Sequence, residues 1–181
     1  MEAVKIMIDP KALFSLSYGL YIVSTSYQGK MNGQIINAMM QLTADPICVA
    51  VCLHKDNFTA ELLEKSRCFS ASVLDIDVTM PFIGIFGFRS GRSFDKFSNC
   101  KEWVMGENGA PKVTENCIAA IEAKVISVAD VYTHKIFVGE VTSAEQIREG
   151  RPLTYADYHT IKKGKSPANA PSAVFNSIRN S

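Results

Sequence analysis

Ile47-Cys48-Val49-Ala50-Val51-Cys52-Leu53 is a continuous apolar run of strand length. A run of this kind predicts a β-strand that is buried on both faces. The polar residues 54–57 break the run, and residues 59–65 then have the spacing of a helix that Asp56 or Asn57 could cap. The sequence therefore predicts a buried strand that leads directly into a short helix.

Further β-rich segments lie on both sides of this run, and short helices separate only some of them. A helix is expected to begin at Asp9-Pro10, and residues 28–30 are expected to form a hairpin turn. Residues 80–110 are irregular, with short helical pieces, and a loop of that length usually has a function of its own. We expect a mostly β barrel in a single domain over 1–181, with 160–181 as an extended tail and strands at 21–27, 34–43, 68–74, 118–128 and 134–143.

The composition excludes several classes of protein. The chain has 181 residues and a formal net charge of +1, so it lacks the basic footprint of a nucleic-acid-binding or membrane-surface protein. It has no apolar run of membrane-spanning length and no signal-peptide pattern at its N-terminus. The five cysteines include no C-x-x-C pair, so no metal site is expected. We expect a cytoplasmic protein with free thiols.

The junction from Cys52 to Thr59 is the strongest candidate for a binding site. Free backbone N–H groups at the start of a helix, together with Lys55 and the Thr59 hydroxyl, could hold a phosphate monoester. An ordinary helix cap beside a surface lysine explains the same residues, and such caps are more common.

Polar groups in other strands are weaker candidates. The amides of Gln34 and Asn37 could bond the edge of a planar heterocycle, or could lie on an exposed sheet face. Cys52 and His134 lie near strand ends and could reach a redox site, although a lone cysteine in an apolar strand is usually inert. The segment Ser93-Phe94-Asp95-Lys96-Phe97, with Phe82, Phe86 and Phe88, could cover one face of a flavin or could form a hydrophobic cluster, which the pattern alone favours.

These stretches together resemble the flavin reductase-like FMN-binding split barrels, in the branch of flavoredoxin, archaeal ferric reductase and the N-domain of high-molecular-weight rubredoxin. The similarity covers nearly the whole chain in the same order. The segments that carry it are 17–23, 32–35, 41–43, 50–53, 82–84, 86–89, 121–125, 133–134, 137–140, 153–159 and 162–165.

The resemblance implies a fold, a cofactor and a set of site residues. The fold would be a Greek-key-like antiparallel split barrel, and the protein a homodimer that holds FMN at or near the subunit interface. Cys52 and His134 would lie beside the flavin as catalytic residues, since matching residues in the ferric reductase branch are associated with nicotinamide or iron chemistry. The residues expected to contact the cofactor are Asn37, Ala38, Met39, Cys52, Leu53, His54, Lys55, Asn57, Thr59, Ser93, Lys96 and Phe97.

The expected activity is hydride transfer from NAD(P)H to bound FMN, followed by electron transfer to free flavin, a ferric chelate or a redox protein. An alternative is a flavoredoxin-like module that a partner protein reduces without direct use of NAD(P)H. The chain departs from relatives at Ala38, where one has threonine, and at His54 and Phe58, where one has asparagine and aspartate. It carries no rubredoxin module, so a rubredoxin-like partner would be a separate protein.

Overall fold

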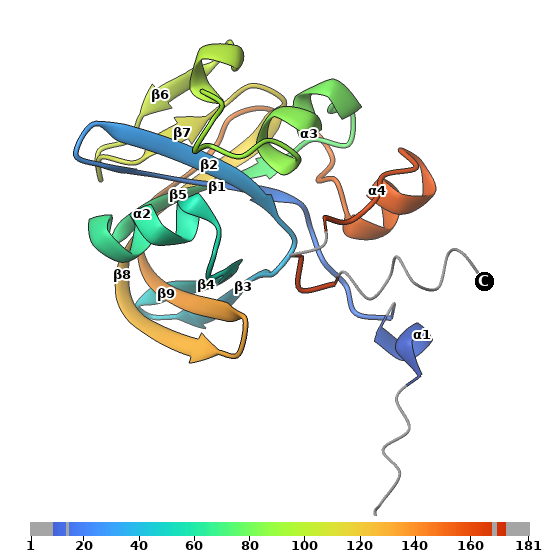
Figure 1. Ribbon diagram of the computed structural model, residues 1–181, viewed down its shortest axis with the longest axis horizontal. Helices are drawn as coiled ribbons and strands as arrows, with labels where there is room; N and C mark the ends of the chain where they lie inside the picture. The colour runs from blue at the N-terminus through green and yellow to red at the C-terminus, as the bar shows by residue number, and fades with distance from the viewer. Residues whose placement is uncertain (1–8, 14, 168–169, 173–181) are drawn as a thin grey trace, which may run out of the picture.

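The computed structural model describes residues 9–13, 15–167 and 170–172. The elements follow one another along the chain as strands with short helices between them (Figure 1). They are α1 (Pro10–Leu13), β1 (Tyr21–Tyr27), β2 (Lys30–Ile36), β3 (Met39–Ala44), β4 (Ile47–His54), α2 (Phe58–Ser66), β5 (Cys68–Leu74), α3 (Met80–Gly87), the 3-10 turn η1 (Phe97–Asn99), β6 (Trp103–Met105), β7 (Pro111–Val113), β8 (Cys117–Val131), β9 (His134–Gln146) and α4 (Tyr155–Thr160).

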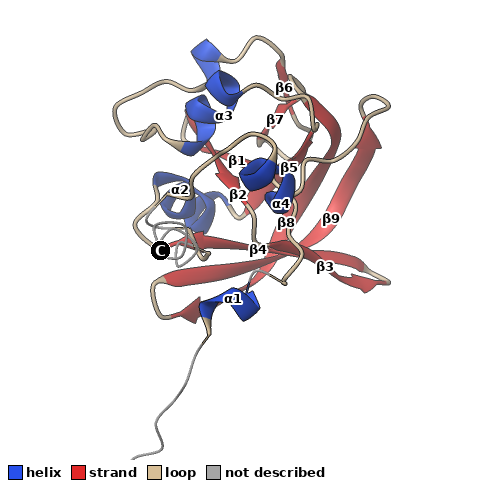
Figure 2. Cartoon of the chain, turned by 90° about the vertical axis from the view of Figure 1, so that its right-hand side faces the viewer, coloured by secondary structure: helices blue, strands red, loops and turns tan. Residues whose placement is uncertain are grey.

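Seven of the strands form one antiparallel sheet in the order β2-β1-β5-β8-β9-β4-β3. The two edge strands, β2 and β3, are consecutive in the chain, and only Asn37 and Ala38 join them. In a flat sheet of seven strands the two edges would be about 29 Å apart, whereas the three residue steps from the end of β2 to the start of β3 reach only about 10 Å. The sheet must therefore curl until its edges approach each other, as Figure 2 shows. The backbone N–H of Cys52 on β4 donates to the carbonyl of Ala38 at this point (3.0 Å). The predicted mostly β split barrel is confirmed.

The hairpin between β1 and β2 turns at Gln28 and Gly29. Both have positive φ angles, 49° and 76°, as a two-residue turn that matches the twist of its strands requires. Gly29 adopts this conformation without steric cost. The predicted turn is thus confirmed, with Lys30 already in β2.

Two groups of buried apolar side chains fill the molecule. One lies around α3 and the start of β1, and the other lies between α2 and the strands β1, β4, β5 and β9. Strand β4 is buried from Cys48 to Val51, as its apolar run predicts. After Val51 the burial of β4 alternates. Leu53 is in the core, whereas Cys52 and His54 are half-buried on the other face of the sheet. This alternation exposes the end of β4 to a cavity.

Two predictions about local structure are wrong. The expected strand over 34–43 is two strands, because the chain crosses between sheet edges at Asn37-Ala38. The irregular region 80–110 includes β6, which pairs with β7 as a short hairpin. Helix α4 and its Thr154 cap, whose side chain accepts from the Asp157 N–H, precede a C-terminal segment that lacks regular secondary structure over 163–167. Parts of the predicted tail, residues 168–169 and 173–181, lie outside the described residues.

No helix within the described ranges has the length and apolar character needed to cross a membrane.

Candidate functional site

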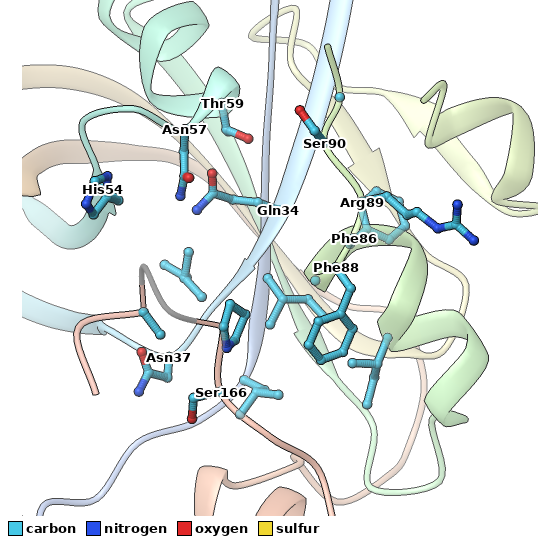
Figure 3. Close-up of a pocket in the computed structure, with 18 of the residues that line it drawn as sticks. Gln34, Asn37, His54, Asn57, Thr59, Phe86, Phe88, Arg89, Ser90 and Ser166 are labelled. Carbon is cyan, nitrogen blue, oxygen red and sulfur yellow. The ribbon is translucent and has the colours of Figure 1, made fainter. Parts of the chain in front are cut away.

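A cavity of about 400 Å³ opens where the two edges of the sheet meet. This volume lies within the usual range of small-molecule sites. Its walls come from β2, the end of β4, the start of α2, the loop after α3, helix α4 and the C-terminal segment (Figure 3). Residues distant in the sequence therefore face one space.

The N-terminus of α2 lies in the wall of this cavity. Asn57 occupies the N-cap position with extended backbone angles (φ −72°, ψ 135°), but its side chain makes no capping hydrogen bond. The side chains of Asn57, Phe58 and Thr59 line the cavity instead. The first N–H groups of a helix need acceptors, and they carry a partial positive charge. The wall is therefore suited to an anionic group.

Thr59 extends this donor set with its hydroxyl. Its side chain is fully buried, and Oγ1 accepts a hydrogen bond from Nδ2 of Asn32 on β2 (2.9 Å). Because that oxygen already accepts a bond, its own proton can be donated to an acceptor in the cavity. The loop after α3 approaches Asn32 closely, since a Cβ on Gly91 would lie 2.0 Å from Oδ1 of Asn32. Glycine at position 91 therefore permits this arrangement.

The two lysines of the predicted site have other partners. Lys55 is not among the lining residues, and its ammonium group lies 3.3 Å from a carboxylate oxygen of Asp130. Lys96 does line the cavity, but its buried ammonium donates to the carbonyls of Gly33 (2.7 Å) and Phe86 (3.1 Å). Burial lowers the pKa of Lys96 to about 8. Lys96 thus joins β2 to the end of α3.

Cys52, His54 and His134 meet on one face of the sheet. His54 pairs with His134 across β4 and β9, and the two imidazole rings are 5.0 Å apart in an edge-to-face arrangement. Cys52 and His54 line the cavity, whereas His134 lies behind His54 and its Nδ1 is 2.8 Å from Oγ1 of Thr133. Burial raises the pKa of the Cys52 thiol, which favours the protonated form. The predicted pair is therefore close together, with only Cys52 on the cavity wall.

The amides of Gln34 and Asn37 both face the cavity from the β2 edge. Asn37 is 5% exposed, and its Nδ2 donates to Oγ of Ser172 (2.8 Å). Both side chains line a cavity rather than an open sheet face, and a bond from either to a planar heterocycle stays a prediction.

The aromatic residues of the 80–97 region divide between core and cavity. Phe82 and Phe97 are in the core, and the Phe97 ring packs against Phe86 at 5.8 Å. Phe86 is buried but reaches the cavity wall, and Phe88 is exposed at its rim. The hydrophobic cluster is therefore confirmed for Phe82, Phe86 and Phe97, and cover of a flavin by this segment stays a prediction.

The predicted cofactor contacts fall into two groups. Asn37, Cys52, His54, Asn57, Thr59 and Lys96 line the cavity, and Ala38, Met39, Leu53, Lys55, Ser93, Phe97 and the neighbouring His134 do not. Leu53 and Phe97 are core residues. Contacts to a bound ligand for any of them stay predictions.

The sequence analysis missed three parts of the wall. The first is the polar loop Arg89–Gly91, whose only signal was its small and basic residues after an apolar helix. Figure 3 shows the Arg89 guanidinium directed away from the other labelled side chains. The second and third are the tyrosines of α4 and the segment around Ser166, whose local sequence gave no sign of a cavity because long-range folding brings them to it.

Among the side chains that the structure describes, no group of three or more His, Cys, Asp or Glu could hold a metal ion. The polar groups of the cavity wall include amides, hydroxyls, the basic side chains of Arg89 and Lys96, His54, the carboxylate of Asp56 and the N–H groups at the start of α2, and several aromatic side chains lie among them. Such donors suit an organic ligand that carries an anionic group and a planar ring.

Comparisons with known proteins agree with this arrangement. A family model described as a flavin reductase like domain matches residues 13–162. A ferric-chelate reductase (NAD(P)H) of Archaeoglobus fulgidus is 47% identical over 163 residues, which are 90% of this chain and 96% of that protein. A high molecular weight rubredoxin of Moorella thermoacetica is 41% identical over 164 residues, which are 91% of this chain and 71% of that protein. The crystal structure of an FMN-binding protein from Thermus thermophilus has a TM-score of 0.71 and 26% identity, with 84% of this chain and 86% of that one covered.

Proposed function

Because this chain belongs to the flavin reductase-like domain family, we propose that it binds FMN in the cavity and transfers electrons from NAD(P)H to an acceptor. The observation that carries this proposal is the uncapped start of α2 in the wall of a 400 Å³ cavity. That geometry would suit a phosphate at one end of a space large enough for an organic ring system, which supports the proposal.

The residues present fit FMN. Thr59 and the backbone N–H groups at the start of α2 would hold the phosphate, with Asn57 beside them. The amides of Gln34 and Asn37 would bond polar atoms of the ribityl chain or the ring edge. FMN, when bound, supplies the redox chemistry by taking up a hydride and releasing electrons. The protein holds and orients it and limits the access of water.

Cys52 and His54 would face the reacting part of the cofactor. The protonated Cys52 thiol is a weak hydrogen-bond donor, and the Asp56 N–H donates to Nδ1 of His54 (3.2 Å). In the neutral His54 ring the proton is therefore on Nε2, which leaves a donor at that nitrogen. We assign His134 to support of His54 through their ring contact. In this proposal Cys52 and His54 act at the cofactor, and His134 acts through His54.

The acceptor can be a ferric chelate, free flavin or a small redox protein. The relatives named for ferric-chelate reduction and for rubredoxin support the first and third choices. A flavoredoxin-like module reduced by a partner is the alternative that the rubredoxin relative favours. The protein would act in the cytoplasm.

A homodimer is part of this proposal. Strand β3 is an edge strand with five consecutive exposed residues. Met40 and Leu42 on it, and Ile47 at the start of β4, are exposed apolar side chains. An exposed apolar edge strand favours association with a second chain.

An anaerobic titration tests the activity. The protein loaded with FMN is mixed with NADH or NADPH, and flavin absorbance is followed by stopped-flow spectroscopy. Rapid bleaching by one of them supports the reductase. Bleaching only after a reduced rubredoxin-like protein is added supports the electron-transfer alternative. An absence of reduction by any of these donors contradicts both.

A further inference from the structure

A buried row of polar side chains connects α4 with the cavity. His159 and Tyr155 come from α4, and Ser166 and Ser172 come from the segment that follows it. All four are at most 8% exposed. The row ends at Asn37, on the opposite side of the cavity mouth from the loop after α3 (Figure 3). Buried polar groups at this density need a consistent set of donors and acceptors.

The first link of the row determines which nitrogen of His159 carries a proton. Nδ1 of His159 is 2.9 Å from the carbonyl oxygen of Gly164. A carbonyl only accepts hydrogen bonds, so Nδ1 must carry the hydrogen. The imidazole packs against the rings of Tyr155 and Tyr158, at 4.4 and 5.2 Å between centroids. In the neutral form of the ring, Nε2 is then an acceptor.

The accepting Nε2 of His159 determines which group donates in the next two hydrogen bonds of the row. Oγ of Ser166 lies 3.5 Å from Nε2 of His159, and its proton is therefore the one donated. Ser166 Oγ is also bonded to the hydroxyl of Tyr155. A hydroxyl has one proton. Once Ser166 donates to His159, Tyr155 must donate to Ser166.

The direction continues to the cavity. Ser172 Oγ donates to the Tyr155 hydroxyl (2.7 Å), and Asn37 Nδ2 donates to Ser172 Oγ (2.8 Å). The amide nitrogen of Asn37 is thereby engaged outside the cavity. In Figure 3 the amide oxygen of Asn37 lies on the side of Gln34, and the nitrogen lies on the other side. The amide presents an acceptor to whatever occupies the cavity.

We propose that His159 is a positioning residue that orients the Asn37 amide through this row, so that the site accepts a ligand with an N–H or O–H donor at that point. The proposal rests on the proposed flavin function for the identity of the ligand, since the ring edge and the ribityl chain of FMN both offer such donors. The row itself is a property of the chain without a ligand. It also makes Ser166 and Ser172, which follow α4, a part of the binding site.

The relay can be read in the protein without flavin. Replacement of Asn37 by aspartate removes the amide donor, so Ser172 must donate to the new carboxylate. Every hydroxyl then reverses, and Nε2 of His159 becomes a donor while Nδ1 stays bonded to the Gly164 carbonyl, so the ring takes up a proton from solvent and becomes an imidazolium. We expect nitrogen-15 NMR to show His159 with hydrogen on Nδ1 alone in the wild type, and with hydrogen on both nitrogens in Asn37→Asp. His159→Gln assigns the signal, because the chain has three histidines.

Two hydroxyl deletions on α4 make the test specific. Tyr155→Phe interrupts the row, so in the double variant with Asn37→Asp the ring of His159 should keep its wild-type state. Tyr158→Phe makes the same chemical change on a hydroxyl that instead donates to the Lys165 carbonyl (2.9 Å), and the His159 response should persist. The proposal would be overturned if wild-type His159 carried hydrogen on Nε2, or if His159 changed in the Asn37→Asp, Tyr155→Phe double variant as it does in Asn37→Asp. Both results are independent of flavin binding.

FMN affinity provides the second readout, and it remains usable if Asn37→Asp does not fold. Ser172→Ala removes the acceptor that holds the Asn37 nitrogen. The dissociation constant for FMN should rise about tenfold, the equivalent of one hydrogen bond. An unchanged constant in both Ser172→Ala and Tyr155→Phe overturns the positioning role. Failure of the wild type to bind FMN refutes the proposed function alone, and the wild-type His159 tautomer then decides the relay.

Discussion

Replacement of Thr59 by valine removes a hydroxyl from the proposed phosphate site with almost no change in shape. Thr59 is fully buried, so the variant keeps the packing at the start of α2. It loses the O–H that we expect to donate to the phosphate. A hydrogen bond to a charged group contributes roughly 1.5–3 kcal/mol, so the FMN dissociation constant should rise by about tenfold to a hundredfold.

The same change has a second, separable effect on stability. Nδ2 of Asn32 is bonded to the Thr59 hydroxyl at 2.9 Å, and Asn32 is 3% exposed. Loss of this acceptor leaves a buried donor without its partner, which costs about 1–3 kcal/mol. Urea denaturation of the flavin-free protein measures this part alone.

Fluorescence titration of the apoprotein with FMN measures the binding part. Thr59→Ser is the matched control, because it keeps the oxygen and loses only a methyl group. Lys55→Ala is a further comparison. The Lys55 ammonium group is paired with Asp130 at 3.3 Å and not with the cavity. Because exposed ion pairs contribute little free energy, we expect Lys55→Ala to change the FMN dissociation constant by about twofold or less. If Thr59→Val binds FMN as tightly as Thr59→Ser, the phosphate does not lie at the start of α2.

Three further changes test other parts of the site. Cys52→Ala should leave FMN bound but lower the rate of flavin reduction by NAD(P)H in stopped-flow experiments, and a wild-type rate would return Cys52 to a packing role. Gly91→Ala would place a Cβ 2.0 Å from Oδ1 of Asn32, so FMN affinity should fall roughly tenfold, whereas an unchanged affinity would show that the loop yields freely. Burial lowers the pKa of Lys96 from 10.5 to about 8, so the unfolded chain binds more protons between these pH values and the free energy of unfolding should rise with pH across them. Relative to Lys96→Met the rise should reach about 3 kcal/mol in urea denaturation at pH 8 and 10.5, and parallel curves would mean that Lys96 has the same pKa in the folded and the unfolded protein.

The strands and the start of the site could be predicted because they depend on local pattern. The apolar run before Leu53 and the polar residues after it already specify a strand that leads into a helix. The interruption at Asn37-Ala38 could not be predicted, since the residues on both sides read as extended and only closure of the sheet requires the crossing.

The hydrogen-bond and ion-pair partners of the predicted site residues could not be predicted from the sequence for a similar reason. Nothing in the sequence near Lys55 indicates that its ammonium group forms an ion pair with Asp130. Nothing near Asn37 indicates a hydrogen bond to Ser172. Local pattern identifies which residues can bind a phosphate or an amide. Contacts between residues far apart in the sequence decide which of them face the cavity.

The central claim is that this cavity binds FMN by its phosphate. Titration of the apoprotein with FMN, FAD and riboflavin, followed by quenching of flavin fluorescence, tests it most directly. The account predicts one FMN per chain and an affinity for riboflavin at least tenfold weaker, because riboflavin lacks the group that the start of α2 and Thr59 would hold. Equal affinity for riboflavin and FMN, or no binding of either, would contradict it.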